Sequence, residues 1–146
     1  MISTRSTLLA ILASLAIPHA ALAASAAVIK VSLQDTSTDP SIPAMTLKAS
    51  ETAVKAGEVR FEVTNESKTL VHEMLVVKSG SPESLPYDAK ADQLIESKFK
   101  SLGEVSELEP GKSGQLTLKL TPGTYLLFCN QVGHFHANMW AKLTVN

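Results

Sequence analysis

The chain is short of cysteine, of excess charge of either sign and of long apolar runs. Its 146 residues include a single Cys, and 13 Lys and Arg stand against 14 Asp and Glu. One Cys cannot form an internal disulfide, and an even charge balance argues against nucleic-acid binding, which calls for a basic patch or stripe. The apolar run of residues 8–17 is shorter than the roughly 20 residues of a membrane-spanning helix, so no stable membrane insertion is expected.

Residues 1–23 have the three parts of a secretory signal peptide. Arg5 lies in a short polar start, residues 8–17 form the apolar core, and Ala21-Leu22-Ala23 is a small-residue exit. No Cys follows the apolar run, so a lipid anchor is not expected. The sequence therefore predicts cleavage after Ala23, with Ala24 and Ala26 as alternatives, and export to a bacterial periplasm. The mature domain of residues 24–146 is long enough for its own core.

The single thiol of an exported protein requires an explanation. Exported domains commonly use cysteines in pairs as disulfides, and a free exposed thiol in an oxidising compartment is open to oxidation. Cys129 is therefore expected to be either buried and inert or bound to a ligand. For the residue taken alone, burial in the core is the simpler interpretation.

Most of the mature chain has the pattern of short β-strands separated by Pro, Gly and Asn turns. Residues 59–63 alternate apolar and charged side chains, which is typical of a half-buried strand. In residues 70–77 the same period places His72, Met74 and Val76 on one face. Seven or eight such strands predict an all-β antiparallel sandwich, and the clearest segments are 27–33, 45–49, 59–63, 70–77, 115–120, 124–129 and 139–145.

Residues 80–110 contain no convincing strand. Within them, residues 88–100 have a pattern that favours a short helix with Leu94, Ile95 and Phe99 turned inward. A segment of this length inside a compact domain usually has a function or a structure of its own. We therefore predict a short helical flap on the sandwich.

Residues 128–140 read FCNQVGHFHANMW and bring sulfur and imidazole side chains together in the sequence. Cys129 ends an apolar strand and Met139 opens the next one, with Gly133 and His134 between them. In a hairpin-like connection both ends of this loop return to the same edge of the sandwich. The thiolate, the His134 imidazole and the thioether are then expected to converge.

A second imidazole has to come from elsewhere in the chain. After signal cleavage the histidines are His72, His134 and His136, and His72 lies in a strand that can present it to the same end of the sandwich. Two imidazoles and a thiolate, with a distant Met on the axis, form the type of site found in blue-copper electron-transfer proteins.

The pattern His72, then Cys129-x4-His134-x4-Met139, resembles the cupredoxins, the small type 1 copper proteins that include azurin, pseudoazurin and plastocyanin. The Cys-to-His spacing with Gly before His is similar to azurin, and the His-to-Met spacing is similar to plastocyanin. The resemblance implies a Greek-key sandwich that holds one copper ion per chain, as Cu(I) or Cu(II). It also implies His72, Cys129, His134 and Met139 as the metal ligands.

Two positions depart from the family pattern, and one residue has alternative roles. Glu73 stands where many cupredoxins have Asn, and Asn130 stands where many have Ser or Thr. If His136 replaced His134 as the ligand, the spacing from Cys129 would not match the family loops, so His136 is interpreted as a solvent-facing neighbour or part of a second, weaker metal site.

The resemblance implies a periplasmic one-electron carrier that docks transiently on a redox protein and functions as a monomer. An enzyme is not expected, because multicopper chemistry requires more histidines and a Cys/His hydrolase would leave His72 and Met139 unused. The alternative is a periplasmic copper chaperone or copper-sequestering protein that uses the same site and delivers the metal to a copper acceptor.

Overall fold

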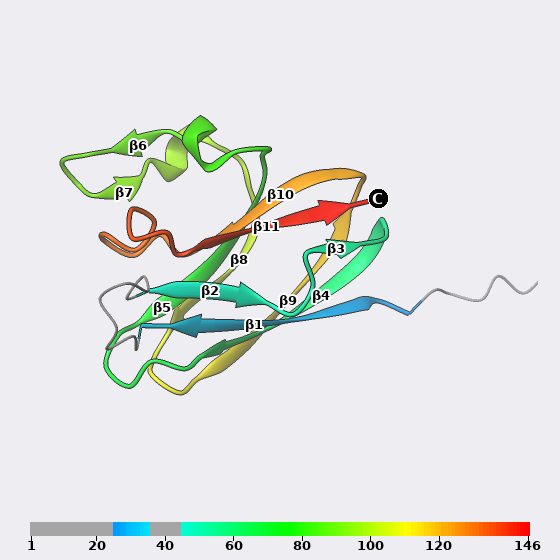
Figure 1. Ribbon diagram of the computed structural model, residues 1–146, viewed down its shortest axis with the longest axis horizontal. Coiled ribbons are helices and arrows are strands. Elements are labelled where there is room, and N and C mark those ends of the chain that lie inside the picture. The colour runs from blue at the N-terminus through cyan, green and yellow to red at the C-terminus, as the bar shows by residue number, and fades with distance from the viewer. Residues whose placement is uncertain (1–24, 36–44) are drawn as a thin grey trace, which may run out of the picture.

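Two β-sheets form the body of the protein in the computed structural model, which describes residues 25–35 and 45–146 (Figure 1). The first sheet has the order β2-β1-β4-β9, and the second has the order β3-β11-β10-β5-β8. The strands of the first sheet are β1 (Ala27–Gln34), β2 (Thr46–Ala49), β4 (Gly57–Asn65) and β9 (Ser113–Leu120). Those of the second are β3 (Ala53–Val54), β5 (His72–Lys78), β8 (Ser101–Leu108), β10 (Gly123–Phe128) and β11 (Trp140–Val145).

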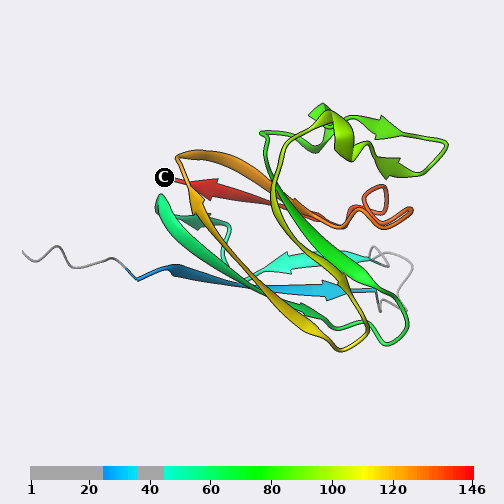
Figure 2. The ribbon, with the colours of Figure 1, turned by 180° about the vertical axis from the view of Figure 1, so that it is seen from behind.

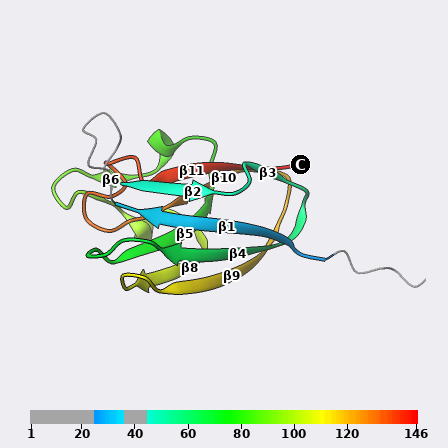
Figure 3. The same cartoon turned by 60° about the horizontal axis from the view of Figure 1, so that its bottom comes forward.

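The alternation of side chains explains why these segments form a sandwich. In β4, Val59, Phe61 and Val63 are buried, while the residues between them are only partly buried or exposed. The buried faces of both sheets meet in one core, which includes Ile29 of the first sheet and Leu127 of the second. Figure 3 shows β1, β4 and β9 side by side as one layer. The predicted Greek-key sandwich is thus confirmed.

The sheets are mixed, which corrects the prediction of purely antiparallel strands. β1 pairs with β4 in parallel, from Ala27 opposite Val59 to Leu33 opposite Asn65, and β11 pairs with β3 in parallel. Parallel neighbours require a crossover connection, and here β2 and β3 lie between β1 and β4 in the chain. Alternation in the sequence reports which face a residue occupies but not the direction of the neighbouring strand, so the error has a physical cause.

The predicted helical flap is wrong in its secondary structure. Residues 79–100, hereafter the flap, contain two 3-10 turns, η1 (Pro82–Ser84) and η2 (Glu96–Lys98), and a small hairpin of β6 (Tyr87–Asp88) and β7 (Gln93–Leu94). The Asp88 carboxylate accepts hydrogen bonds from the backbone N–H groups of Lys90 and Ala91 at 2.9 and 3.1 Å, which closes a turn where a helix would have started. Asp92, with φ of 54°, completes it.

The flap covers the outer face of the second sheet. A second apolar cluster lies there, with Leu75, Val77, Leu126 and Phe128 from the sheet and Leu94 from the flap. Strand β5 is therefore buried on both faces from His72 to Val77. The views in Figures 1 and 2 both place the flap beside the loop between β10 and β11, so it borders the end of the sandwich where the predicted ligands lie.

No helix within residues 25–35 and 45–146 is long and apolar enough to cross a membrane. The predicted signal peptide of residues 1–23 lies outside the described residues.

Candidate metal centre

The strands bring the predicted ligand positions to one end of the sandwich. His72 is the first residue of β5, Cys129 directly follows β10, and Met139 directly precedes β11. Strand β10 pairs with β11 on one side and with β5 on the other. The backbone N–H of Cys129 donates to the carbonyl of Met139 at 3.0 Å, so the loop of residues 129–139, hereafter the ligand loop, closes as the predicted hairpin-like connection.

Tight turns inside the ligand loop bring His134 back towards the strands. The N–H of Met139 donates to the carbonyl of His134 at 3.0 Å, and the N–H of Ala137 donates to that of Gly133 at 2.9 Å. Gly133 has φ of 79° and Asn138 has φ of 65°, a left-handed conformation that Gly and Asn adopt most readily. The Gly before His134 is thus required by the turn.

Three donor side chains meet in a buried cluster. The Nδ1 atoms of His72 and His134 are 3.1 Å apart, and Cys129 Sγ lies 3.9 Å from the first and 3.3 Å from the second. Donor pairs around one metal lie about 3–4 Å apart when metal–N bonds are about 2.0 Å and metal–S bonds about 2.3 Å. A thiol and two imidazoles at this spacing fit a single copper ion.

Burial sets the protonation of these donors in the metal-free protein. Burial, helped by the neighbouring His134 imidazole and opposed by the charge of Asp35, lowers the pKa of His72 from 6.5 to about 4. Burial also lowers the pKa of His134, against the same Asp35 charge. Burial raises the pKa of the Cys129 thiol to about 11, although backbone N–H groups directed at Sγ favour the thiolate. At neutral pH all three donors are therefore uncharged.

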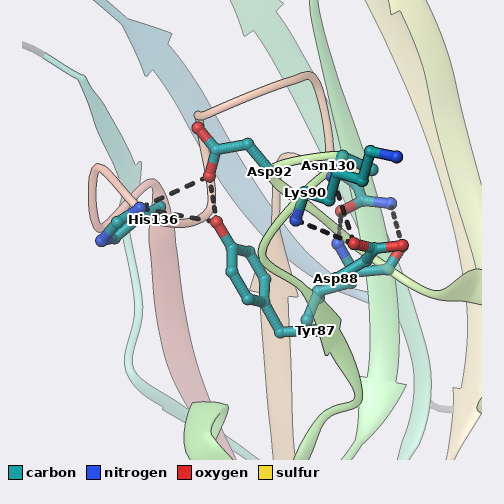
Figure 4. A network of polar contacts seen from close by, with 8 residues as sticks. Tyr87, Asp88, Lys90, Asp92, Asn130 and His136 are labelled. Carbon is teal, nitrogen blue, oxygen red and sulfur yellow. Dashed lines mark hydrogen bonds and ion pairs between the residues drawn. The ribbon is translucent and has the colours of Figure 1, made fainter.

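The backbone of Met139 is hydrogen-bonded to Cys129 and His134, whereas His136 is exposed to solvent. Met139 is fully buried in the same core as Cys129. The side chain of His136 is 76% exposed, and its Nδ1 lies 3.4 Å from Asp92 Oδ1 and 3.4 Å from the Tyr87 hydroxyl (Figure 4). His136 is thus placed as the predicted solvent-facing neighbour of the ligand loop.

The two departures from the family pattern, Glu73 and Asn130, directly follow His72 and Cys129 in the sequence, and both are buried. Glu73 is 8% exposed, and burial together with the charge of Glu96 raises its pKa, whereas the backbone N–H of Asn130 and the side chain of Gln131 lower it. The side chain of Asn130 is buried and hydrogen-bonded to the flap. Both residues thus connect the ligand loop to neighbouring segments.

Sequence reasoning missed Asn65 and Ser67, which hold the segment before His72 in place. The Asn65 side chain donates to the carbonyls of Leu70 and Leu108 at 2.8 and 2.7 Å and accepts from the N–H of Ser67 at 2.9 Å. It therefore fixes the segment that leads into His72. Ser67 in turn donates to Asp35 at 2.8 Å. In the sequence these residues have only the composition of turns, which gave no signal of a role in the site.

Comparisons with known proteins identify the family of the chain. The chain matches the cupredoxin-like domain family over residues 7–145. Among solved structures, it is similar to reduced auracyanin from Roseiflexus castenholzii, with 22% identity, a TM-score of 0.60, and coverage of 85% of this chain and 99% of the other. Rusticyanin from Thiobacillus ferrooxidans has 18% identity and a TM-score of 0.60, with coverage of 84% and 79%.

A search of curated protein sequences finds no match to this chain. The family match spans nearly the whole sequence, the similar structures share its fold, and the buried thiol and imidazoles fit one copper ion. The chain belongs to the cupredoxin family.

Proposed function

We propose that the mature protein is a periplasmic electron carrier that binds one copper ion through His72, Cys129, His134 and Met139. The observation that carries the proposal is the donor cluster, in which Nδ1 of His72, Nδ1 of His134 and Sγ of Cys129 lie 3.1 to 3.9 Å apart. A bound copper ion would supply the one-electron couple between Cu(I) and Cu(II). No enzymatic role is proposed.

The ligand set and the fold both support electron transfer. Thiolate and thioether suit Cu(I) and imidazoles suit both oxidation states, so the same residues can hold both forms. His72 and Cys129 are fully buried at strand ends, and the strands restrict their movement. Such a preformed site favours fast electron exchange because little has to rearrange. Both auracyanin and rusticyanin have been described in reduced form.

His134 is the proposed point of electron entry and exit. It is 7% exposed, whereas His72 and Cys129 are completely buried. Val132, with 64% of its surface exposed, and the partly buried Phe135 flank it in the ligand loop. A small apolar surface of this kind suits brief docking of a redox protein, which needs little buried area. We propose a monomer that docks in this way.

Ligand variants test the copper site. Cys129→Ser is expected to abolish the intense thiolate-to-copper visible band of the loaded protein, and His134→Ala is expected to weaken or shift it. His136→Ala is the matched control from the same loop and should leave the band nearly unchanged, because His136 faces solvent. A band retained in Cys129→Ser, or lost in His136→Ala and kept in His134→Ala, would overturn the assignment.

Repeated redox cycling separates an electron carrier from a copper chaperone. The protein is loaded with Cu(II), then reduced and reoxidised in the presence of a copper chelator, while bound metal and the visible band are followed. A carrier should recover the band fully after each cycle, since the same four residues hold both oxidation states. Loss of copper at each reduction would instead support the chaperone or sequestering function.

A further inference from the structure

The side chain of Asn130 pairs with the backbone of the flap as a neighbouring strand would. Its Oδ1 accepts a hydrogen bond from the N–H of Leu94 at 2.8 Å, and its Nδ2 donates to the carbonyl of Leu94 at 3.1 Å. Nδ2 also donates to Glu96 Oε1 at 2.8 Å. Asn130 is 3% exposed, so its side-chain amide makes these three hydrogen bonds to the flap instead of to water.

Two further hydrogen bonds join the same two segments. Gln93 Nε2 donates to the carbonyl of Asn130 at 2.7 Å, and the N–H of Gly133 donates to the carbonyl of Asp92 at 2.8 Å. The flap therefore holds the residue that follows Cys129 and the residue that precedes His134. Figure 4 shows Asn130 beside the flap hairpin, together with the exposed contacts of Asp92, Tyr87 and His136.

Within the described residues, the ligand loop has few other backbone hydrogen bonds to the rest of the protein. Those of His134, Ala137 and Asn138 run to carbonyls inside the loop. Packing reinforces the junction, because the Phe128 ring contacts Phe135 of the loop and Phe99 of the flap at centroid distances of 5.5 and 6.0 Å. Apart from Glu73 of β5, which contacts Asn130 and Gln131, the flap is thus the main external support of the loop.

We propose that the flap is a structural part of the metal centre and that Asn130 is the positioning residue that couples them. By fixing Asn130 on both its side chain and its carbonyl, the flap sets the backbone between Cys129 and His134. It thereby holds Sγ and the His134 imidazole at their spacing before any metal binds. The N–H of Gln131, which is directed at Sγ, belongs to the same fixed stretch. The consequence for copper rests on the proposed function, whereas the consequence for the loop does not.

Hydrogen exchange of the metal-free protein tests the coupling directly. In Asn130→Ala, the N–H of Leu94 loses its acceptor and the loop loses its link to the flap. Exchange of the Leu94, Gln131 and Gly133 amides should therefore accelerate by roughly tenfold or more, while β4 amides remain protected. Tyr125→Phe is the matched control: its hydroxyl bonds to the carbonyl of Thr121 at 2.7 Å, in the turn between β9 and β10 at the far end of β10. It should lower stability without selective exchange in the loop.

A double variant that exchanges the amide of Asn130 and the carboxylate of Glu96 provides a rescue. Asn130→Asp keeps the acceptor for the Leu94 N–H but loses both donors and places a carboxylate against Glu96, so loop exchange should accelerate. Adding Glu96→Gln restores a donor and acceptor across this contact and should recover much of the protection. If Asn130→Ala does not fold, Gln93→Ala removes only the bond to the Asn130 carbonyl and serves as the milder variant.

Loading the same variants with copper tests whether the position of the loop affects the metal. A positioning role predicts that Asn130→Ala shifts the visible band and the reduction potential, that the rescue pair returns both towards wild type, and that Tyr125→Phe changes neither. Unchanged exchange of the loop amides in Asn130→Ala would overturn the proposal. A wild-type protein without a thiolate-to-copper band would overturn the proposed function instead, and the exchange data would still decide whether the flap positions the loop.

Discussion

At the scale of single residues, Cys129 carries the proton that has to leave when a metal binds. Burial raises the pKa of this thiol to about 11, and it lowers the pKa of His72 to about 4 and that of His134 below its usual value. Metal ligands bind deprotonated. We therefore predict that Cu(II) binding at neutral pH releases one proton per chain, measured by calorimetry in buffers of different ionisation enthalpy. Cys129→Ser should release none, and release of two protons from the wild type would contradict this prediction.

Asp35 is the charged residue that acts on both imidazoles. Its charge raises the pKa of His72 and of His134 against the effect of burial. Its Oδ2 accepts a hydrogen bond from Ser67, and its Oδ1 is buried without a partner among the described residues. A negative charge at this place stabilises Cu(II) over Cu(I), so it lowers the reduction potential.

Neutralising Asp35 should therefore raise the potential of the copper-loaded protein. We predict that Asp35→Asn increases it by roughly 30–90 mV, measured by voltammetry. Glu66→Gln is the matched control, because Glu66 is an exposed carboxylate bonded to Gln34. A lower potential in Asp35→Asn, or an equal rise in Glu66→Gln, would show that the Asp35 charge does not act on the metal.

At the scale of elements, β8 and β9 approach each other closely enough to require glycine. A Cβ on Gly114 in β9 would clash with Val105 Cγ1 of β8 and touch Leu108 Cδ2 at 3.4 Å. We predict that Gly114→Ala destabilises the protein by about 1–3 kcal/mol, measured by denaturant unfolding, because the core has no room for the methyl group. Gly80→Ala, where nothing lies within 4 Å, should be near neutral. Equal stability of the two variants would contradict the close approach.

The elements also show what the sequence could predict and what it could not. Strand β4 was predictable because its buried and outward side chains alternate along the whole strand. Strand β8 was not, because as the edge strand it buries only Val105 and Leu108. The flap was misread as helical because Asp88 binds the backbone N–H groups of the turn, a local competition that apolar spacing does not reveal.

The metal centre likewise has features that the sequence could predict and features that it could not. Cys129 and His134 are close in the sequence, and the period of β5 placed His72 on the inward face, so the meeting of these three side chains was predictable. The support of the site was not, because it consists of hydrogen bonds between residues far apart in the chain. Asn130 binds the backbone of Leu94, 36 residues away, and Asn65 binds that of Leu108, 43 residues away. No sequence spacing encodes such pairs.

At the scale of the whole molecule, the buried imidazoles connect the metal site to the stability of the metal-free fold. The folded protein disfavours protonation of His72, whose pKa is about 4, whereas the unfolded chain is protonated below 6.5. The unfolded state therefore binds more protons between these values, and stability falls as pH falls through this window. The lowered pKa of His134 acts in the same direction. Glu73, whose pKa burial raises, acts in the opposite direction from its ordinary value of 4.5 upwards.

The size of the effect follows from the shift of His72. The fold lowers the pKa of His72 from 6.5 to about 4. At about 1.4 kcal/mol per pH unit, the folding stability lost across this window is ~3 kcal/mol. We predict that the free energy of unfolding of the metal-free protein is highest between pH 6.5 and 9, because the raised pKa of Cys129 lowers stability at higher pH. It should decline from pH 6.5 towards pH 4 and flatten below it, as measured by urea denaturation at fixed ionic strength. His72→Gln keeps the buried side chain polar but removes its titration, so it should be less stable at neutral pH and show a shallower decline. A wild-type protein equally stable at both ends of the window would mean that His72 is not held neutral by the fold.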